Sequence, residues 1–178
     1  LISSEKISST LRSLVNIRVG TVALFGFASG LPLALTGGTL QAWMAVEGVD
    51  LKTIGLFSLV GLPYALKFFW APLLDRFTLP FLGRRRGWIL VTQFALMGLI
   101  FLLSLTSPQN TPWLVALLAL LLTFTSASQD IVVDAYRTDV LREKERGLGA
   151  AVSVTGYRIA MLTSGALALI LSDSLGWR

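Results

Sequence analysis

Five long apolar runs, separated by short polar connections, limit what this chain can fold into. A helix needs about 20 mostly apolar residues to cross the hydrocarbon core of a bilayer, and 54% of the residues here are hydrophobic. Alternating apolar and polar residues, the pattern of a transmembrane barrel, are missing from all five runs. The sequence therefore predicts an all-α integral membrane protein with spans at about 19–46, 54–74, 88–105, 112–133 and 148–171.

Basic residues are distributed unevenly around these runs, and their distribution predicts the orientation of the chain. Three lie in an N-terminal arm (residues 1–18), four in the second connection and four in the fourth, against one in the first connection and one at the C-terminal end. Connections rich in lysine and arginine stay in the cytoplasm. We therefore expect a cytoplasmic N terminus, followed by a transmembrane domain of residues 19–178 in the lipid bilayer. Because the positive charge lies between apolar runs, it does not indicate a nucleic-acid partner.

The sequence contains neither cysteine nor histidine. Without cysteine, disulfides and cysteine-ligated metals are excluded, and without histidine the chain lacks the most common general base and metal ligand. The spans also hold no clustered serine–lysine pair of the kind that activates a nucleophile. We therefore predict no catalytic residue, no metal site and no cofactor, and we do not expect an enzyme.

The first apolar run contains residues that weaken a helix in its middle. Gly26 and Gly30 are four positions apart, a spacing that lets two helices approach closely. The stretch 32–38 then holds one proline and two glycines, and the polar Gln41 follows it. Transporters use such broken helices to turn backbone groups toward a substrate, whereas a tolerated kink is the structural alternative. Both interpretations stay open, and Gln41 is a candidate substrate-binding residue.

The second connection combines a carboxylate with several arginines. Asp75 and Arg76 directly follow the second apolar run, and Arg84 and Arg85 lie in a run of three arginines. The arginine run could serve only to fix the topology. A carboxylate and a guanidinium paired at a helix end can, however, hold neighbouring helix ends together and separate during a conformational change. We therefore treat these four charged residues as candidate ion-pair or gate residues.

The fourth apolar run ends in polar residues that share one helix face. At 3.6 residues per turn, a single stripe holds Ser126, Asp130, Asp134 and Arg137. Gln129 lies about 100° to one side of that stripe. Lipid would penalise these side chains, so they should face a bundle interior or a hydrated cavity. By spacing, Arg137 can pair with either aspartate.

Two cations within the spans could interact with these carboxylates. At 1.5 Å per residue, Asp130 lies about 25 Å from the outer end of its span, and Lys67 about 20 Å from the outer end of its own. Arg158 lies about 15 Å from the inner end of the fifth span, near the middle of the membrane. Lys67 is therefore the favoured partner of Asp130, which leaves Arg158 for an anionic ligand. Tyr157 and Gln129 complete the candidate substrate-binding set.

A buried carboxylate beside a cation can exchange a proton for an ion pair as a transporter alternates between its two sides. We predict that Asp130 contributes to proton coupling in this way. Asp134, which is closer to the cytoplasmic interface, is the second coupling candidate, with a gate role favoured for it. A static ion pair that holds the second, fourth and fifth spans together is the alternative interpretation.

Several sequence blocks resemble those of AmpG-type muropeptide permeases, a branch of the major facilitator superfamily. The blocks are GFASGLPLAL, GTLQAWM, IGLFSLVGLPYALKFFWAPLLDR, FLGRRRGW and SASQDIVVDAYRTDVL. The superfamily carries Gly-x-x-x-Asp-Arg-x-Gly-Arg-Lys/Arg between its second and third helices, and the matching residues here are Asp75, Arg76, Gly83, Arg84 and Arg85. The chain departs from this motif by five extra residues before Gly83 and by Ala71 in place of the first glycine.

The resemblance implies both a fold and a function. It implies a major facilitator helical bundle in which this chain supplies five helices of the N-terminal six-helix domain, with the C-terminal transmembrane half missing. It also implies import of anhydro-muropeptides (GlcNAc-anhydro-MurNAc peptides) across the bacterial inner membrane, driven by the proton gradient, for cell-wall recycling and β-lactamase induction. A carrier for another polar anion, such as acetyl-CoA, is the alternative, and a structural subunit is a third interpretation.

Overall fold

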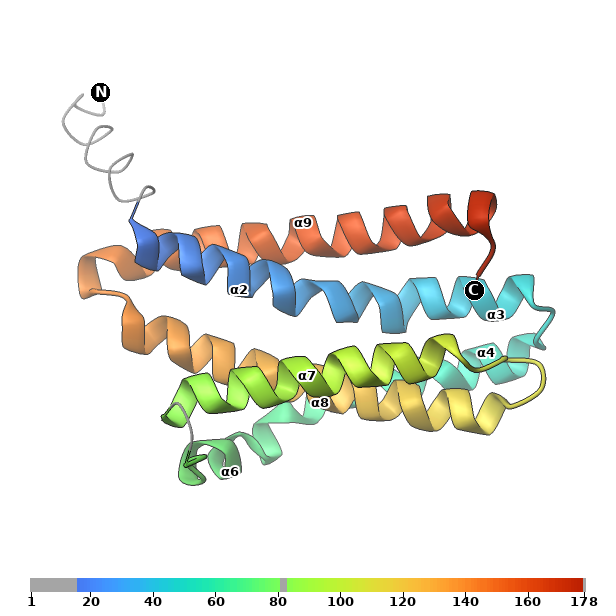
Figure 1. The fold of residues 1–178 in the computed structure, drawn as a ribbon, viewed down its shortest axis with the longest axis horizontal. Coiled ribbons are helices and arrows are strands. Elements are labelled where there is room, and N and C mark those ends of the chain that lie inside the picture. The colour runs from blue at the N-terminus through green and yellow to red at the C-terminus, as the bar shows by residue number, and fades with distance from the viewer. Residues whose placement is uncertain (1–15, 81–82, 178) are drawn as a thin grey trace.

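The described part of the chain is built from helices alone (Figure 1), which confirms the predicted all-α class. The structure, a computed structural model, describes residues 16–80 and 83–177. Within these residues, five helices are long and apolar enough to cross a membrane, so the chain is a multi-pass membrane protein. Most of the predicted N-terminal arm, residues 1–15, lies outside the described residues, as does Arg178.

The five candidate spans differ in how continuous their helices are. Span 1 consists of α2 (Ile17–Ala34), the π-helical segment η1 (Leu35–Thr39) and α3 (Leu40–Val46). Span 2 is divided further, into α4 (Leu51–Phe57), η2 (Ser58–Gly61), α5 (Leu62–Leu66) and η3 (Lys67–Phe69), and α6 (Ala71–Arg76) follows it. The remaining three spans are unbroken, and they are α7 (Arg84–Ser104), α8 (Pro112–Val140) and α9 (Glu143–Leu175).

Three helices extend beyond the predicted spans into polar sequence. α7 begins at Arg84 rather than near residue 88, and α8 continues to Val140 rather than ending near residue 133. α9 begins at Glu143, before the predicted start near residue 148. An apolar run marks only the part of a helix inside the hydrocarbon, and the hydrogen-bonded backbone continues through charged residues outside it. Asp134, Arg137 and Asp139 therefore lie on α8 and not in a loop.

The small residues predicted at a helix interface pack α2 tightly against α9. A Cβ atom at Gly26 would run into the backbone of Ser153, and one at Gly30 would run into the backbone of Tyr157. Gly156 of α9 lies similarly close to the backbone of α2. The close approach predicted from the glycine spacing is therefore confirmed.

The predicted weak point of span 1 is present as the π-helical segment η1. Gly37 within it has φ −89° and ψ −109°, which is outside the helical range. Just before it, Thr36 donates a hydrogen bond from Oγ1 to the carbonyl oxygen of Pro32 at 2.9 Å. Segments of π-helix inside α-helices are rare and occur frequently at functional sites. The prediction of a broken first helix is confirmed.

α8 is the central helix of the described bundle, because it contacts elements of all four other spans. Figure 1 shows α2 running alongside α9, and α7 running alongside α8. The side chains of α8 that are buried in this arrangement include the polar residues Gln129 and Asp130. A buried carboxylate within a membrane span is costly, so Asp130 marks a candidate functional position.

Candidate functional site

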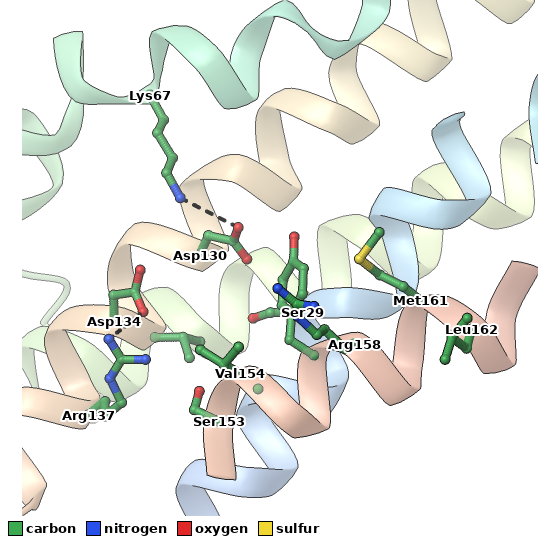
Figure 2. Close-up of a pocket in the computed structure, with 13 residues that line it drawn as sticks. Ser29, Lys67, Asp130, Asp134, Arg137, Ser153, Val154, Arg158, Met161 and Leu162 are labelled. Atoms are coloured by element: carbon green, nitrogen blue, oxygen red, sulfur yellow. Dashed lines mark ion pairs between the residues drawn. The ribbon is translucent and has the colours of Figure 1, made fainter. Parts of the chain in front are cut away.

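A cavity of about 690 Å³ opens between α2, α8 and α9, with one residue of span 2 reaching into it (Figure 2). Its volume falls within the range of about 300–1,000 Å³ that is typical of small-molecule sites. The two α2 residues in its wall, Gly26 and Ser29, come from the glycine-packed face against α9. Six charged or aromatic polar residues line it, and they are Lys67, Asp130, Asp134, Arg137, Tyr157 and Arg158.

Lys67 and Asp130 form the ion pair that the depth argument predicted. Lys67 Nζ lies 3.6 Å from Asp130 Oδ2, and Figure 2 shows the lysine reaching across from span 2 to α8. The side chain of Asp130 is 10% exposed and that of Lys67 is 34% exposed. The carboxylate is therefore held in the interior, whereas its cation remains partly accessible.

The second oxygen of this carboxylate lacks a partner among the described residues. Asp130 Oδ1 is buried without a hydrogen bond, and so is the hydroxyl of Ser29, which lines the same cavity. Buried polar atoms are normally satisfied by protein or water. The carboxylate of Asp130 therefore keeps hydrogen-bonding capacity that the described residues do not use.

Asp134 and Arg137 pair with each other on α8. Arg137 Nη2 lies 3.2 Å from Asp134 Oδ1, three residues along the same helix. Spacing alone left Asp130 and Asp134 as alternative partners for Arg137, and the structure selects Asp134. The Asp134 side chain is 55% exposed, so this pair lies at the open margin of the cavity.

Tyr157 and Arg158 bring α9 into the same cavity. Within residues 16–80 and 83–177, Arg158 makes no ion pair, whereas Lys67 and Arg137 each have an aspartate. The close contact of Gly30 with the backbone of Tyr157 fixes the positions of Tyr157 and Arg158 along the length of α2. The site thus combines a paired acid and base with one cation that is available to an anionic ligand.

Two other predicted substrate-binding residues do not line this cavity. Gln129 is fully buried and donates a hydrogen bond from Nε2 to Oε1 of Gln93 on α7, at 2.7 Å. The rotation of about 100° between neighbouring helical positions turns Gln129 away from the Asp130 face. Gln41 lines a separate cavity of about 70 Å³ beside Tyr64 and the π-helical segment. The structure therefore does not bring either glutamine to Tyr157 and Arg158.

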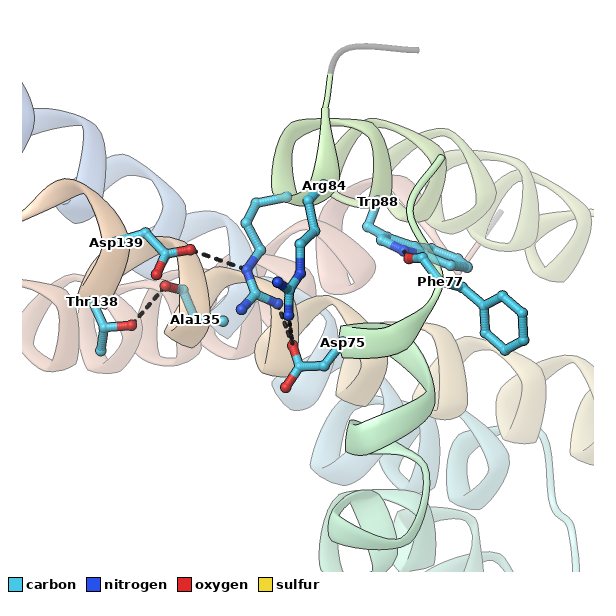
Figure 3. Close-up of polar contacts among 8 residues, drawn as sticks. Asp75, Phe77, Arg84, Trp88, Ala135, Thr138 and Asp139 are labelled. Atoms are coloured by element: carbon cyan, nitrogen blue, oxygen red, sulfur yellow. Dashed lines mark hydrogen bonds and ion pairs between the residues drawn. The ribbon is translucent and has the colours of Figure 1, made fainter. Parts of the chain in front are cut away.

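A second charged cluster joins α6, α7 and α8 (Figure 3). Asp75 accepts a hydrogen bond from Arg85 and lies 3.8 Å from Nη2 of Arg84. Arg85 Nε also lies 3.1 Å from Oδ2 of Asp139 on α8, so one guanidinium bridges two carboxylates from different helices.

Arg76 differs from the expectation for this cluster, because it makes no ion pair in the part of the chain that the structure describes. Adjacent helical residues point about 100° apart, so Asp75 and Arg76 cannot both face α7. Asp139 was not among the site residues predicted from the sequence. The signal for it was a carboxylate in the fourth connection, on the same predicted side of the membrane as the arginine run.

Two serines of α8 accept hydrogen bonds from span 2, and neither contact was predicted from the sequence. Tyr64 Oη donates to Ser126 Oγ at 2.7 Å, and Trp70 Nε1 donates to Ser128 Oγ at 3.0 Å. Ser126 belonged to the predicted polar stripe, but its partner could not be assigned from spacing. The signal in the sequence was a tyrosine three residues before Lys67 and a tryptophan three residues after it, since both side chains can donate hydrogen bonds to a neighbouring helix.

Comparison with known proteins gives relatives that are transporters. Residues 21–175 match the family described as acetyl-coenzyme A transporter 1. The chain is 57% identical over 172 residues to a protein named anhydromuropeptide permease from Escherichia coli (strain K12), covering 96% of this chain and 35% of the permease. It is 38% identical over 161 residues to the protein named putative transporter AmpG 1 from Rickettsia conorii, covering 88% of this chain and 39% of that protein.

The chain therefore spans between a third and two fifths of the length of these curated relatives. The resemblance to AmpG-type permeases is confirmed, and the five apolar helices are consistent with part of a major facilitator-type transporter domain. Because the family model covers most of its length, the chain belongs to the acetyl-coenzyme A transporter 1 family.

Proposed function

We propose that the protein carrying this chain is a proton-driven secondary transporter that imports anhydro-muropeptides across the bacterial inner membrane, for cell-wall recycling and β-lactamase induction. The observation that carries the proposal is a cavity lined by both the Lys67–Asp130 pair and Arg158. The name of the 57% identical relative, anhydromuropeptide permease, supports this substrate class. In this proposal the N terminus is cytoplasmic, the spans lie in the lipid bilayer, and the protein is not an enzyme.

The substrate would be held by the α9 wall of the cavity. A muropeptide carries carboxylates and sugar rings, and the guanidinium of Arg158 can bind a carboxylate through two parallel hydrogen bonds. The ring of Tyr157 can stack on a sugar while its hydroxyl offers a hydrogen bond to the ligand. An arginine within a span costs at least about 2.5 kcal/mol on insertion scales, so binding an anion gives it a function that offsets this cost.

Proton coupling would depend on Asp130. In one state, the ion pair with Lys67 offsets the cost of a buried negative charge, and in the other state protonation removes that charge. Asp130 and Ser29 both line the cavity, and the Oδ1 atom of Asp130 is buried without a hydrogen-bond partner among the described residues, so the carboxyl could accept a proton in this proposal. Asp134 and Arg137, at the exposed margin of the cavity, would act as a gate.

The cluster of Asp75, Arg85 and Asp139 would hold the cytoplasmic ends of three helices together. Asp75 and Asp139 are about half exposed, and ion pairs in contact with water typically contribute about 0–1 kcal/mol each. Such pairs can open and close at low energetic cost during alternating access. Arg84 adds a weaker contact to the same carboxylate.

Acetyl-CoA is the second candidate substrate, and the description of the matching family favours it. Acetyl-CoA carries several phosphate charges and would need several cations in its site. Among the described residues that line the cavity, one cation, Arg158, has no acidic partner. This charge balance fits a ligand with isolated carboxylates better than a polyphosphate.

The two substrates are distinguished by uptake into proteoliposomes that contain the full-length protein. Radiolabelled anhydro-muropeptide should accumulate when the outer solution is made more acidic than the lumen, and excess unlabelled acetyl-CoA should not compete with it. Accumulation of acetyl-CoA instead would replace the proposed substrate, and equal uptake of anhydro-muropeptide with and without the proton gradient would contradict the proposed energy source.

A further inference from the structure

We propose that Tyr64 and Trp70 are positioning residues that hold Lys67 opposite Asp130, through hydrogen bonds to two serines of α8. This inference rests on the proposed function and extends it to residues that touch neither the substrate nor the proton. Its basis is that the backbone around Lys67 is irregular, while the side chains on either side of it are anchored to the same helix that carries Asp130.

The backbone of span 2 does not fix Lys67 by itself. α5 ends at Leu66, and Lys67 begins the 3₁₀ segment η3. Leu66 has φ −97° and ψ 1°, and Trp70 has φ −106° and ψ −2°, so both ends of this segment depart from α-helical geometry. Short 3₁₀ stretches within a helix often mark hinges. The lysine therefore stands on a part of the chain that can bend.

Two hydrogen bonds bracket Lys67 and tie this segment to α8. Three residues before it, the Tyr64 hydroxyl donates to Ser126 Oγ at 2.7 Å, and three residues after it, Trp70 Nε1 donates to Ser128 Oγ at 3.0 Å. Ser128 donates its own proton to the carbonyl oxygen of Phe124 at 2.8 Å, which orients its oxygen to accept from the indole.

The Trp70 ring has a second contact with α8. Its centroid lies 4.7 Å from the centroid of the Phe124 ring, at an interplanar angle of 34°. Phe124 is thus the residue that both orients Ser128 and packs against Trp70. The anchor after Lys67 therefore combines a hydrogen bond with an aromatic contact, whereas the anchor before it depends on the Tyr64 hydroxyl.

Apolar packing around Lys67 is too sparse to replace these bonds. Leu66, Phe68 and Phe69 are 41%, 62% and 67% exposed in the described structure, so they bury little surface against the other described helices. In a bilayer, lipid tails satisfy such side chains as well as a neighbouring helix would, so apolar residues do not draw the segment toward α8. Hydrogen bonds between helices remain as the specific interaction at this position.

The two anchors therefore determine how closely Lys67 approaches Asp130. While both hold, the ammonium stays within 3.6 Å of the carboxylate. Loss of either would let the 3₁₀ segment bend and would weaken the ion pair without removing any of its charges. A change in the pH dependence of transport, rather than a loss of substrate binding, is the expected result.

The test compares Tyr64→Phe, Ser126→Ala and the double variant in the full-length protein, using uptake of radiolabelled anhydro-muropeptide as a function of pH. Each single variant should move the pH of half-maximal uptake by about half a unit, which is the order of effect expected from one interhelical hydrogen bond. Because both variants remove the same bond, the double variant should move it no further. Ser126→Thr keeps a hydroxyl and should restore the wild-type profile.

Tyr136→Phe is the matched control, because the Tyr136 hydroxyl makes no hydrogen bond in the described structure, and this variant should keep the wild-type profile. The inference is overturned if Tyr64→Phe and Ser126→Ala give the same pH profile as Tyr136→Phe while Asp130→Asn alters it. It is also overturned if their effects simply add. If Asp130→Asn itself leaves the pH profile unchanged, the proposed coupling function fails, and the positioning inference fails with it.

Discussion

Lys67 Nζ lies 3.6 Å from Asp130 Oδ2, so two membrane spans that carry opposite charges meet at the wall of one cavity. Neither charge would be stable facing lipid, and in the ion pair each charge offsets the cost of burying the other. The same cavity is lined by Arg158, a cation without an acidic partner among the described residues. This arrangement separates the parts of the site expected to carry the proton from those expected to bind the substrate.

Replacing Lys67 alone should destabilise the protein more than replacing both members of the pair. Removal of one partner of a fully buried pair costs about 3–5 kcal/mol, but a third of the Lys67 side chain is exposed, so we expect about 1–2 kcal/mol for Lys67→Met. Lys67→Met with Asp130→Asn should recover most of that loss, because no buried charge is left unpaired. Thermal unfolding of the purified protein in detergent measures the stability of the single and the double variant. Equal losses of stability in the two variants would contradict an energetic coupling between Lys67 and Asp130.

Arg158→Ala should weaken binding of anhydro-muropeptide by about 10- to 100-fold, because a hydrogen bond to a charged group contributes about 1.5–3 kcal/mol. Arg158→Lys should recover part of the affinity, since it keeps the charge but loses the planar pair of donors. Equilibrium binding to the purified full-length protein gives both values. Lys144→Ala, on the polar first turn of α9, serves as the control. Unchanged affinity in a normally expressed Arg158→Ala protein would remove this residue from the site.

Gly30→Ala should destabilise the contact between α2 and α9. The new Cβ atom would run into the backbone of Tyr157, and overpacking of this kind typically costs about 1–3 kcal/mol. Gly20→Ala makes the same chemical change on the same helix at a position with no atom within 4 Å. That control should be neutral or slightly stabilising, since alanine favours helix over glycine by about 1 kcal/mol. If both variants unfold at the same temperature, the close packing is not significant for stability.

Arg85→Gln should make the cavity more accessible from the cytoplasmic side. It removes the guanidinium that joins Asp75 to Asp139, whereas Arg76→Gln removes a charge that has no ionic partner among the described residues. The chain contains no cysteine, so a single Val154→Cys residue in the cavity wall can report labelling by a membrane-impermeant maleimide. We expect labelling several-fold faster with Arg85→Gln than with Arg76→Gln. Equal labelling rates would contradict a role of this cluster in closing the cytoplasmic side.

Helix spacing and membrane depth were sufficient to predict the features that depend on period and length. The close approach of α2 and α9 follows from glycines four residues apart. The Lys67–Asp130 pair follows from the rise per residue, because two charges at the same depth in a bundle have few other partners. The break in span 1 follows from the conformational preferences of proline and glycine.

Features that depend on which helices are neighbours could not be predicted in this way. Gln129 was expected beside the substrate, but its rotation on α8 directs it to Gln93 of α7. Asp75 was expected to act with Arg76, yet the arginine that reaches it belongs to another helix. Single-residue rotations of about 100° decide such contacts, and one sequence gives the order of residues on each helix without the arrangement of the helices around it.

The most direct test of the account is the behaviour of Asp130→Asn in proteoliposomes that contain the full-length protein. Asparagine cannot exchange a proton, so the variant should lose accumulation of labelled anhydro-muropeptide driven by an acidic outer solution. It should still exchange labelled for unlabelled substrate across the membrane, because Arg158 and the cavity remain. Accumulation at the wild-type level under the same proton gradient would contradict the claim that Asp130 couples transport to protons.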